Sequence, residues 1–353
     1  MLNTQLRRLI PLLVLITGAV LASLLDSPRT WASRIQDGDT SYEDELLKGK
    51  DLFRKRKYDD ALKSFKRAND MRGKQSAECY SWMSETYMAL EAYKNVIEAA
   101  DKVLQFAGDD KQLLIKAYNN KGLALQASAE KKDQKKLQAS EAVFRQGLAL
   151  ENAPAILRYN LGVTLLQLNR DDEGIAEIKQ YIKLEPKGSY TETARKLVEN
   201  PRRARENFAP DFSFTSSQGE YITLEDLKGK VVLLDFWGTW CPPCVESVPD
   251  LRQLQKHYAN EPSFVLIGIS SDHDEQAWRE FTERNKMVWP QYRDEDRRIQ
   301  RAFGVHAFPT YIVIDHEGVV RFQSVGFSWQ RAASLDDAIK KQVKIAAKST
   351  EAR

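Results

Sequence analysis

Residues 234–244 read LDFWGTWCPPC, and this stretch decides how the second half of the chain folds. An apolar run ending in Trp237 is followed closely by Cys241 and Cys244, which two prolines separate. The β-branched and large apolar residues ahead of the pair predict a buried strand over 231–237, and a helical pattern follows. The cysteine pair is therefore expected where a strand ends and a helix begins.

Two cysteines at this spacing could bind a metal, cross-link the fold or carry out redox chemistry. A zinc site needs about four ligands, and the chain offers neither a second cysteine pair nor a histidine at ligand spacing. A structural disulfide across two residues closes so short a loop that it removes little chain entropy. Redox exchange is therefore the favoured use, and metal binding and a structural disulfide are the weaker alternatives.

The position of the pair also suggests how the work is divided between the two sulfurs. The dipole and the unpaired N–H groups at a helix N-terminus favour a thiolate and lower the pKa of Cys241, which makes it the attacking sulfur. Cys244 lies one turn further into the helix. It is expected to be more buried and to resolve the mixed disulfide.

Short strands and helices alternate around this pair. Strands are predicted over 231–237, 264–269, 310–314 and 319–325, and helices over 245–258, 274–285, 294–303 and 330–344. The turn at 315–318 makes the last two strands an antiparallel hairpin. This order predicts an α/β domain built around one central sheet.

The stretch LLDFWGTWCPPC, together with FGVHAFPTYIVID at 303–315, resembles the thioredoxin fold. More narrowly it resembles the TlpA/ResA-like group of exported thiol-disulfide oxidoreductases. APDFSF at 209–214 resembles that group's N-terminal extension, and residues 262–303 resemble its inserted strand–helix segment. The resemblance covers residues 207–347. It implies protein disulfide substrates, a thiol electron donor that is often a membrane protein, and neither a cofactor nor a metal.

The resemblance also assigns roles to individual residues. Cys241 is the nucleophile and Cys244 the resolving thiol. Pro309 corresponds to the cis-proline that faces the pair, and a cis bond there exposes the backbone of Phe308 for strand-like pairing with a substrate. Trp237 and Trp240 are expected to flank the site, with core packing as the alternative for each. The residues expected to contact a substrate are Trp240, Phe308 and Pro242.

Asp235 matches the buried aspartate of thioredoxin itself. A carboxylate beneath the disulfide can take the proton from Cys244 as its sulfur attacks. A hydrogen-bonded core aspartate without a catalytic role is the alternative. The TlpA/ResA-like group commonly has a glutamate three residues after the second cysteine, where this chain has Ser247. Glu246 is turned away from that place by about 100° on the helix, so it receives no proton-handling role.

Pro242 and Pro243 are a second departure from the group. Neither residue has a backbone N–H to offer the Cys241 thiolate. The pair is therefore expected to be reducing, closer to thioredoxin at about −270 mV than to DsbA at about −120 mV. A peroxiredoxin-like thiol peroxidase is a weaker alternative, because the Pro-x-x-x-Thr-x-x-Cys pattern of peroxidatic cysteines is not matched ahead of Cys241.

Residues 42–206 are predicted to be helical and to repeat with a period near 34 residues. Small residues come first in each repeat, at Gly49, Ser84, Gly122 and Gly162. A triad follows in the next helix, and it is small–bulky–small in the first and third repeats. Its members are Ala61/Phe65/Ala68, the degenerate Val96/Ala100/Val103, Ser140/Phe144/Gly147 and Gly174/Ile178/Tyr181. The third repeat carries six extra residues around AEKKDQKKLQ at 129–138. The pattern resembles tetratricopeptide repeats, whose stacked helix pairs bury a stripe that no single pair can bury.

Such an array binds a partner, and its concave groove is expected to take a peptide whose identity the sequence does not give. A spacer or a dimerisation element is the alternative. A helix over 191–199 is expected to cap the last pair, and Cys79 is expected to be a buried small residue. A competing interpretation of the whole chain is a repeat-based scaffold in which the thioredoxin fold is only an adaptor.

Residues 1–32 are predicted to be a signal peptide or a membrane anchor. Arg7 and Arg8 precede the apolar run LIPLLVLITGAVLASLL at 9–25, so the chain is either periplasmic and soluble after cleavage or anchored by that run. Residues 33–41 are expected to be a linker and 348–353 a tail. The 353 residues suit two or three domains, and the 53 basic and 50 acidic residues give no indication of nucleic-acid binding.

Overall fold

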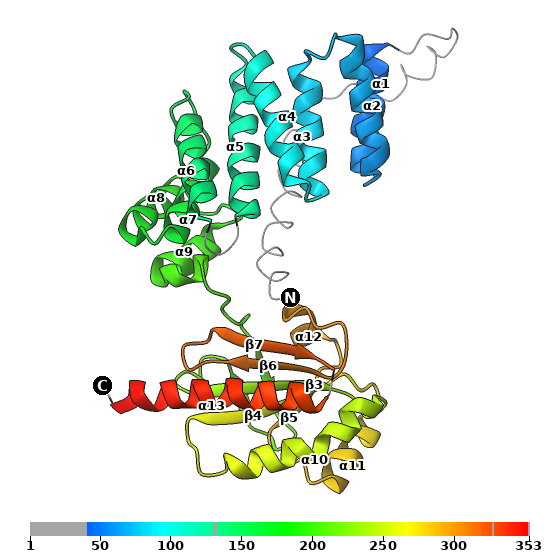
Figure 1. Ribbon diagram of the computed structural model, residues 1–353, viewed down its shortest axis with the longest axis vertical. Coiled ribbons are helices and arrows are strands. Elements are labelled where there is room, and N and C mark those ends of the chain that lie inside the picture. Colours follow the sequence, from blue (N-terminus) through cyan, green and yellow to red (C-terminus); the bar gives the residue numbers. More distant parts are fainter. Residues whose placement is uncertain (1–40, 130–132, 327, 352–353) are drawn as a thin grey trace. The chain divides into compact units, whose positions relative to one another are not determined.

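The computed structural model describes residues 41–129, 133–326 and 328–351. The chain forms two compact units that divide after Arg205, a helical array and an α/β unit (Figure 1). The predicted signal peptide or anchor at 1–32 and almost all of the predicted linker lie outside the described residues, as do residues 352–353 of the tail. No helix within the described ranges is both long and apolar enough to cross a membrane.

The first unit is an all-α repeat array, as predicted. Its α-helices between residues 41 and 205 are α1 Tyr42–Arg54, α2 Tyr58–Met71, α3 Ala77–Ala89, α4 Tyr93–Phe106, α5 Lys111–Ser128, α6 Gln134–Leu148, α7 Ile156–Gln167, α8 Asp171–Leu184 and α9 Thr191–Glu199. Helices α1/α2, α3/α4, α5/α6 and α7/α8 pack in pairs, and α9 packs on α8. Cys79 on α3 is fully buried, and burial raises the pKa of its thiol.

Glycines lie where the paired helices touch. A Cβ atom on Gly49 would lie 2.5 Å from the ring of Phe65, and one on Gly122 would lie 2.5 Å from the ring of Phe144. No real side chain tolerates contacts this short, so only glycine lets each bulky residue of the triad reach the facing helix. The small-residue positions of the sequence pattern are therefore packing positions.

The third repeat is longer than the others, and the extra length lies partly in a helix. Helix α5 has 18 residues, whereas α1 and α3 have 13 each and α7 has 12. The rest lies in the connection from α5 to α6, of which residues 130–132 are outside the described ranges.

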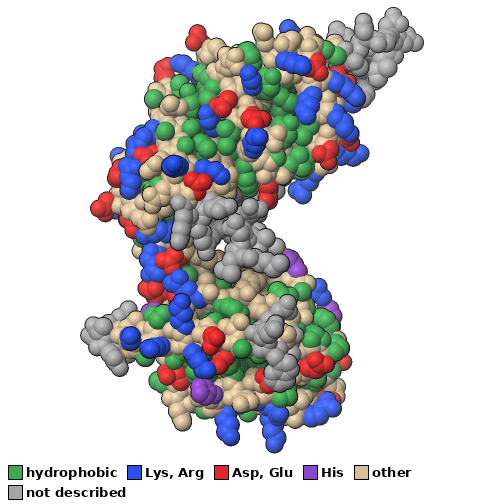
Figure 2. Space-filling view, viewed as in Figure 1, with side chains coloured by type: hydrophobic (Ala, Val, Ile, Leu, Met, Phe, Trp, Pro, Cys, Tyr) green, Lys and Arg blue, Asp and Glu red, His purple; other side chains and the backbone are tan. Residues whose placement is uncertain are grey.

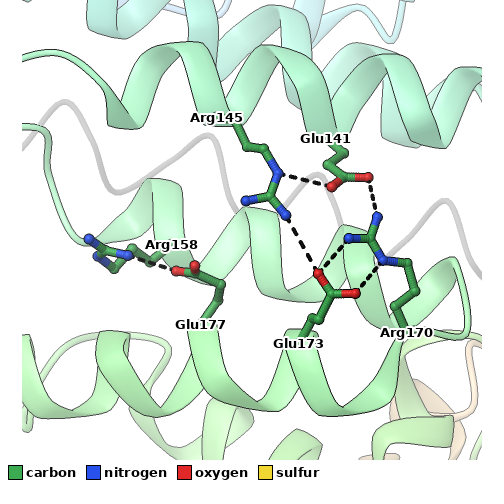
Figure 3. A network of polar contacts seen from close by, with 6 residues as sticks. All are labelled: Glu141, Arg145, Arg158, Arg170, Glu173 and Glu177. Atoms are coloured by element: carbon green, nitrogen blue, oxygen red, sulfur yellow. Dashed lines mark hydrogen bonds and ion pairs between the residues drawn. The ribbon is translucent and has the colours of Figure 1, made fainter.

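Charged side chains join the third repeat to the fourth (Figure 3). Glu141 on α6 accepts hydrogen bonds from Arg145 at 2.9 Å and from Arg170 at 2.6 Å, and Arg170 also binds Glu173 of α8. Single exposed ion pairs contribute little, whereas a network in which each partner orients the next holds its geometry better. On the visible face of both units, basic and acidic side chains are interspersed (Figure 2).

The second unit is built on a five-stranded sheet with the order β5-β4-β3-β6-β7. Its elements are β1 Ser213–Thr215, β2 Tyr221–Thr223, β3 Val231–Trp237, α10 Pro242–His257, β4 Phe264–Ser270, α11 Glu275–Arg284, β5 Gln291–Arg293, α12 Arg298–Ala302, β6 Thr310–Ile314, β7 Val320–Val325 and α13 Trp329–Glu351. The central strand β3 runs parallel to β4 and antiparallel to β6. Strands β6 and β7 form the predicted hairpin.

Both faces of the sheet are covered, which explains the unbroken apolar run of β3. Leu233 and Trp237 face a core completed by α10, α11 and α13, while Leu234 and Phe236 face a second core completed by β1, β2 and α12. Successive side chains of a strand point to opposite faces, so a central strand between two covered faces is apolar throughout. All seven residues of β3 are buried, and its end is fixed firmly in place.

The structure differs from the sequence prediction in its shortest elements. Strands β1, β2 and β5 have three residues each, too few to show an alternating pattern, and were not predicted. Helix α12 begins at Arg298 and not at 294, because the Asp294 carboxylate accepts the N–H groups of Ile299 and Gln300 and holds residues 294–297 in a turn. Helix α10 begins at Pro242, three residues earlier than predicted, and α13 extends to Glu351.

Candidate redox site

Cys241 and Cys244 are joined by a disulfide at the junction of β3 and α10, and their Cα atoms are 5.3 Å apart. Cys241 is the N-cap residue of α10, and Pro242 and Pro243 are its first two residues. The two cysteines are 4% and 2% exposed, so both are buried in this disulfide form and the expected difference between them is small. The pair therefore lies at the junction of strand and helix that the sequence predicts.

The first turn of α10 offers few donors to a thiolate. Pro242 and Pro243 have no N–H, and the N–H of Cys244 already donates to the Cys241 carbonyl at 3.0 Å. The N–H of Val245 donates to the same carbonyl at 3.1 Å. A negative charge on Cys241 would therefore be stabilised by the helix dipole with little help from direct backbone hydrogen bonds.

Asp235 lies in the middle of β3 on the face that carries Trp237 and packs into the core containing both cysteines. Its side chain is 1% exposed, and Oδ1 has no hydrogen-bond partner among the described residues. Loss of water around the carboxylate disfavours its charged form and raises the pKa of Asp235 to about 8. The carboxyl group therefore exchanges its proton near neutral pH, as a general acid or base must.

The other residues predicted at the site are Trp237, Trp240, Pro242, Phe308 and Pro309. The Phe308–Pro309 peptide bond is cis and comes immediately before β6, the strand that pairs with β3. Trp240 is 57% exposed and meets the Phe308 ring edge-on, with 5.4 Å between ring centroids. Pro242 is also exposed. Trp237 is buried against Phe281 and packs in the core.

Glu246 and Ser247 follow the cysteine pair on α10. Ser247, where the resembling group has a glutamate, is buried and donates a hydrogen bond to the Cys244 carbonyl at 2.7 Å. Glu246 is exposed.

Tyr311 pairs with Asp235 in the β3–β6 register and lines a cavity of about 410 Å³ between α10 and α13. Within the described ranges, no group of three or more acidic, histidine or cysteine side chains is arranged to bind a metal ion.

Sequence reasoning missed one buried aspartate beside the pair. Asp272 follows β4 and accepts hydrogen bonds from Thr239, which lies two residues before Cys241. The signal was available, because the polar run Ser270–Asp272 follows the apolar residues 264–269 directly. That Asp272 lies close to the cysteine pair can be inferred only once β4 is known to be the parallel neighbour of β3.

A cysteine pair at the N-terminus of a helix, after the central strand of such a sheet, with a cis-proline just before the neighbouring strand, defines the thioredoxin class of folds. The Redoxin family model matches residues 204–339. The thioredoxin-like protein YneN of Bacillus subtilis is 37% identical over 119 residues, which are 33% of this chain and 69% of YneN. The thiol-disulfide oxidoreductase ResA of Bacillus thuringiensis is 36% identical over 118 residues, 33% of this chain and 68% of ResA.

Among solved structures, a thiol:disulfide interchange protein of the thioredoxin family from Chlorobium tepidum is 29% identical. The match covers 39% of this chain and 97% of that protein, with a TM-score of 0.36. From the sequence relatives, the chain belongs to the family of thioredoxin-like thiol-disulfide oxidoreductases that includes YneN and ResA. The α/β unit is thus an oxidoreductase domain that exchanges thiols and disulfides.

Proposed function

We propose that Cys241 and Cys244 reduce disulfides in exported proteins. The Cys241 thiolate attacks one sulfur of a substrate disulfide, and the other substrate sulfur leaves as a thiolate and takes up a proton. Cys244 then attacks the Cys241 sulfur of the mixed disulfide, its thiol proton passes to Asp235, and the second substrate sulfur leaves as a thiolate and takes up a proton. The observation that supports this sequence most directly is the buried, unpaired carboxyl of Asp235 in the same core as the pair.

The surroundings of Cys241 favour the reducing direction. A potential rises when the thiolate of the reduced form is stabilised, and the two prolines withhold the backbone donors that would do so. We therefore place the pair nearer to about −270 mV than to about −120 mV. After each turnover the disulfide must be reduced by a thiol donor, which a membrane protein could supply.

Trp240, Phe308 and Pro242 form the proposed substrate rim. Trp240 and Pro242 are exposed and Phe308 is half-buried, and this apolar surface suits a polypeptide that lies across Pro309 in extended form. The signal or anchor predicted at 1–32 supports a location outside the cytoplasm, either free in the periplasm or held by residues 9–25.

The helical array is proposed to bind a partner, either the substrate or the electron donor. One surface supports this: on α1 and α5, the ammonium groups of Lys50 and Lys116 lie 5.4 and 5.7 Å from the ring centre of Trp82 on α3. The same lysines pair with Glu78 at 2.7 Å and Glu85 at 3.3 Å. A half-buried aromatic ring among charges of both signs is a suitable contact for a peptide.

The reduction potential of the pair tests the proposal. The chain from about residue 33 is equilibrated in dithiothreitol or glutathione buffers and followed by tryptophan fluorescence, with Cys241→Ser as the control that has no transition. A two-electron transition well below about −200 mV supports a reductase. A value near −120 mV reverses the direction to oxidation, and no transition leaves the scaffold interpretation, in which the repeats carry the function.

A further inference from the structure

Asp272 and Thr239 form a hydrogen-bonded cluster beside the disulfide that the proposed chemistry does not use. The side chain of Asp272 is 3% exposed. Its carboxylate accepts the Thr239 N–H at 3.1 Å from each oxygen, the Thr239 hydroxyl at 2.6 Å and the Ser270 hydroxyl at 2.6 Å. A buried carboxylate with this many donors has one favourable orientation, because any other leaves it without partners.

This cluster attaches the connection between β3 and α10 to the end of β4. Thr239 is the middle residue of the segment 238–240, which leads into Cys241. A second attachment lies beside it, where the Ser271 N–H donates to the Trp237 carbonyl at 2.9 Å. The backbone ahead of Cys241 is therefore held by the neighbouring strand and not only by its own turn.

The position of Trp240 depends on this attachment. Its indole is 57% exposed, so burial in the core does not fix it. The ring folds back over Gly238, where an added Cβ would lie 2.7 Å from Nε1, and it meets Phe308 edge-on. Because neither contact encloses the ring, the backbone beneath it decides where the indole lies.

We propose that Asp272, acting through Thr239, is a positioning residue that holds Trp240 against Phe308, so that a polypeptide substrate meets a preformed apolar rim beside Cys241. The inference rests on the proposed function of the cysteine pair. In this role Asp272 accepts hydrogen bonds and takes no part in the thiol–disulfide chemistry. Asp272 should therefore affect the binding only of substrates that are large enough to reach the rim. Small aromatic disulfides should not depend on it.

Kinetics of the full chain test this with two substrates: insulin, a polypeptide disulfide, in the steady state with dithiothreitol as the electron donor, and 5,5′-dithiobis(2-nitrobenzoic acid), a small disulfide, in a single turnover of the pre-reduced chain. Thr239→Val keeps the shape and the backbone N–H but removes the hydroxyl donor, and Asp272→Asn weakens the acceptor. For both variants we expect KM for insulin to rise about tenfold with kcat nearly unchanged, since a hydrogen bond to a charged group is lost. Reduction of the small disulfide should not change, and Thr239→Ser should behave as the parent chain.

The same unit offers a matched control. Thr223 donates its hydroxyl to Asp226 at 2.6 Å in the turn after β2, an exposed copy of the same contact. Asp226→Asn should leave the kinetics with both substrates unchanged. If Asp272→Asn slows the two substrates equally, Asp272 supports the cysteine pair itself and the inference is wrong.

A double variant tests the route through the indole. If Asp272 acts through Trp240, Trp240→Ala and Trp240→Ala combined with Asp272→Asn should have the same KM for insulin, because the first change already removes what the second would displace. Multiplying effects would overturn the inference. The failure of the underlying function looks different, because the parent chain would then be no more active than Cys241→Ser on either substrate.

Discussion

Replacing Asp235 with asparagine should stabilise the oxidised protein at high pH and not at low pH. Burial raises the pKa of this carboxyl from its usual 3.8 to about 8. Below pH 3.8 the group is protonated in the folded and unfolded chain alike and has no effect on stability. Between the two values only the unfolded chain is ionised, so folding takes up a proton and stability falls as the pH rises.

The magnitude follows from the same two values. Each pH unit in that window corresponds to about 1.36 kcal/mol, so the interval from 3.8 to about 8 gives a loss on the order of 6 kcal/mol. Above pH 8 the carboxylate is ionised in both states and the loss is constant. The Asp235→Asn chain has no such group, so its advantage over the parent should grow from near zero at pH 4 to its full value at pH 9.

Guanidinium unfolding of the oxidised chain at fixed pH values from 4 to 9 measures this. Five of the seven tryptophans lie after residue 206, so emission mainly follows the redox unit. A Cys79→Ala background prevents disulfide reshuffling at high pH. An asparagine that packs poorly shifts the whole curve without changing its slope, so the slope is diagnostic. If the parent chain and Asp235→Asn show the same dependence on pH, the carboxyl is not held in its uncharged form and the reasoning fails.

Three further changes test other parts of the structure. Asp235→Asn should slow resolution of a Cys241 mixed disulfide about 100-fold at pH 7 in stopped-flow measurements, and the parent rate should rise with pH up to about 8, since only the ionised carboxyl accepts a proton; unchanged kinetics would remove Asp235 from the mechanism. Pro243→Ala restores a backbone N–H in the first turn of α10, and one charge-assisted hydrogen bond should raise the potential by roughly 30 mV in dithiothreitol equilibria; a lower potential would contradict the account of the prolines. Gly122→Val places methyl groups on the Phe144 ring and should destabilise the array by about 2 kcal/mol in thermal unfolding followed by circular dichroism; an unchanged midpoint would mean that the helices separate without cost.

The sequence predicted the elements whose patterns are long. The seven-residue run of β3 and the helix 191–199 have the predicted bounds, and the repeating small residues marked the contacts between paired helices. The three-residue strands carried too little pattern to predict. The predicted start of α12 was wrong because the Asp294 side chain determines where the helix begins. No break in periodicity marks that residue.

The candidate site also has a part that the local sequence predicts and a part that it does not. The position of Cys241 and Cys244 followed from the local pattern, because both residues lie within a few positions of a strong strand signal. Asp272 is 31 residues from Cys241 in the sequence, and only the pairing of β3 with β4 brings them together. Contacts across a sheet depend on register, which hydrophobic alternation alone does not fix when both faces are buried.

Asp235 and Asp272 are both buried but have opposite hydrogen-bonding environments. Asp235 is in the middle of β3 with a buried oxygen that has no hydrogen-bond partner among the described residues, so the cost of charging the buried group holds its proton. Asp272 is at the end of β4 with hydroxyl and N–H donors on both oxygens, so moving it breaks several hydrogen bonds at once. A carboxyl that lacks partners is free to exchange a proton and lowers stability at high pH, whereas one that is fully hydrogen-bonded holds its neighbours in place. Substitution by asparagine should separate the two: at Asp235 it should change the pH dependence of stability and resolution, and at Asp272 the KM for a polypeptide.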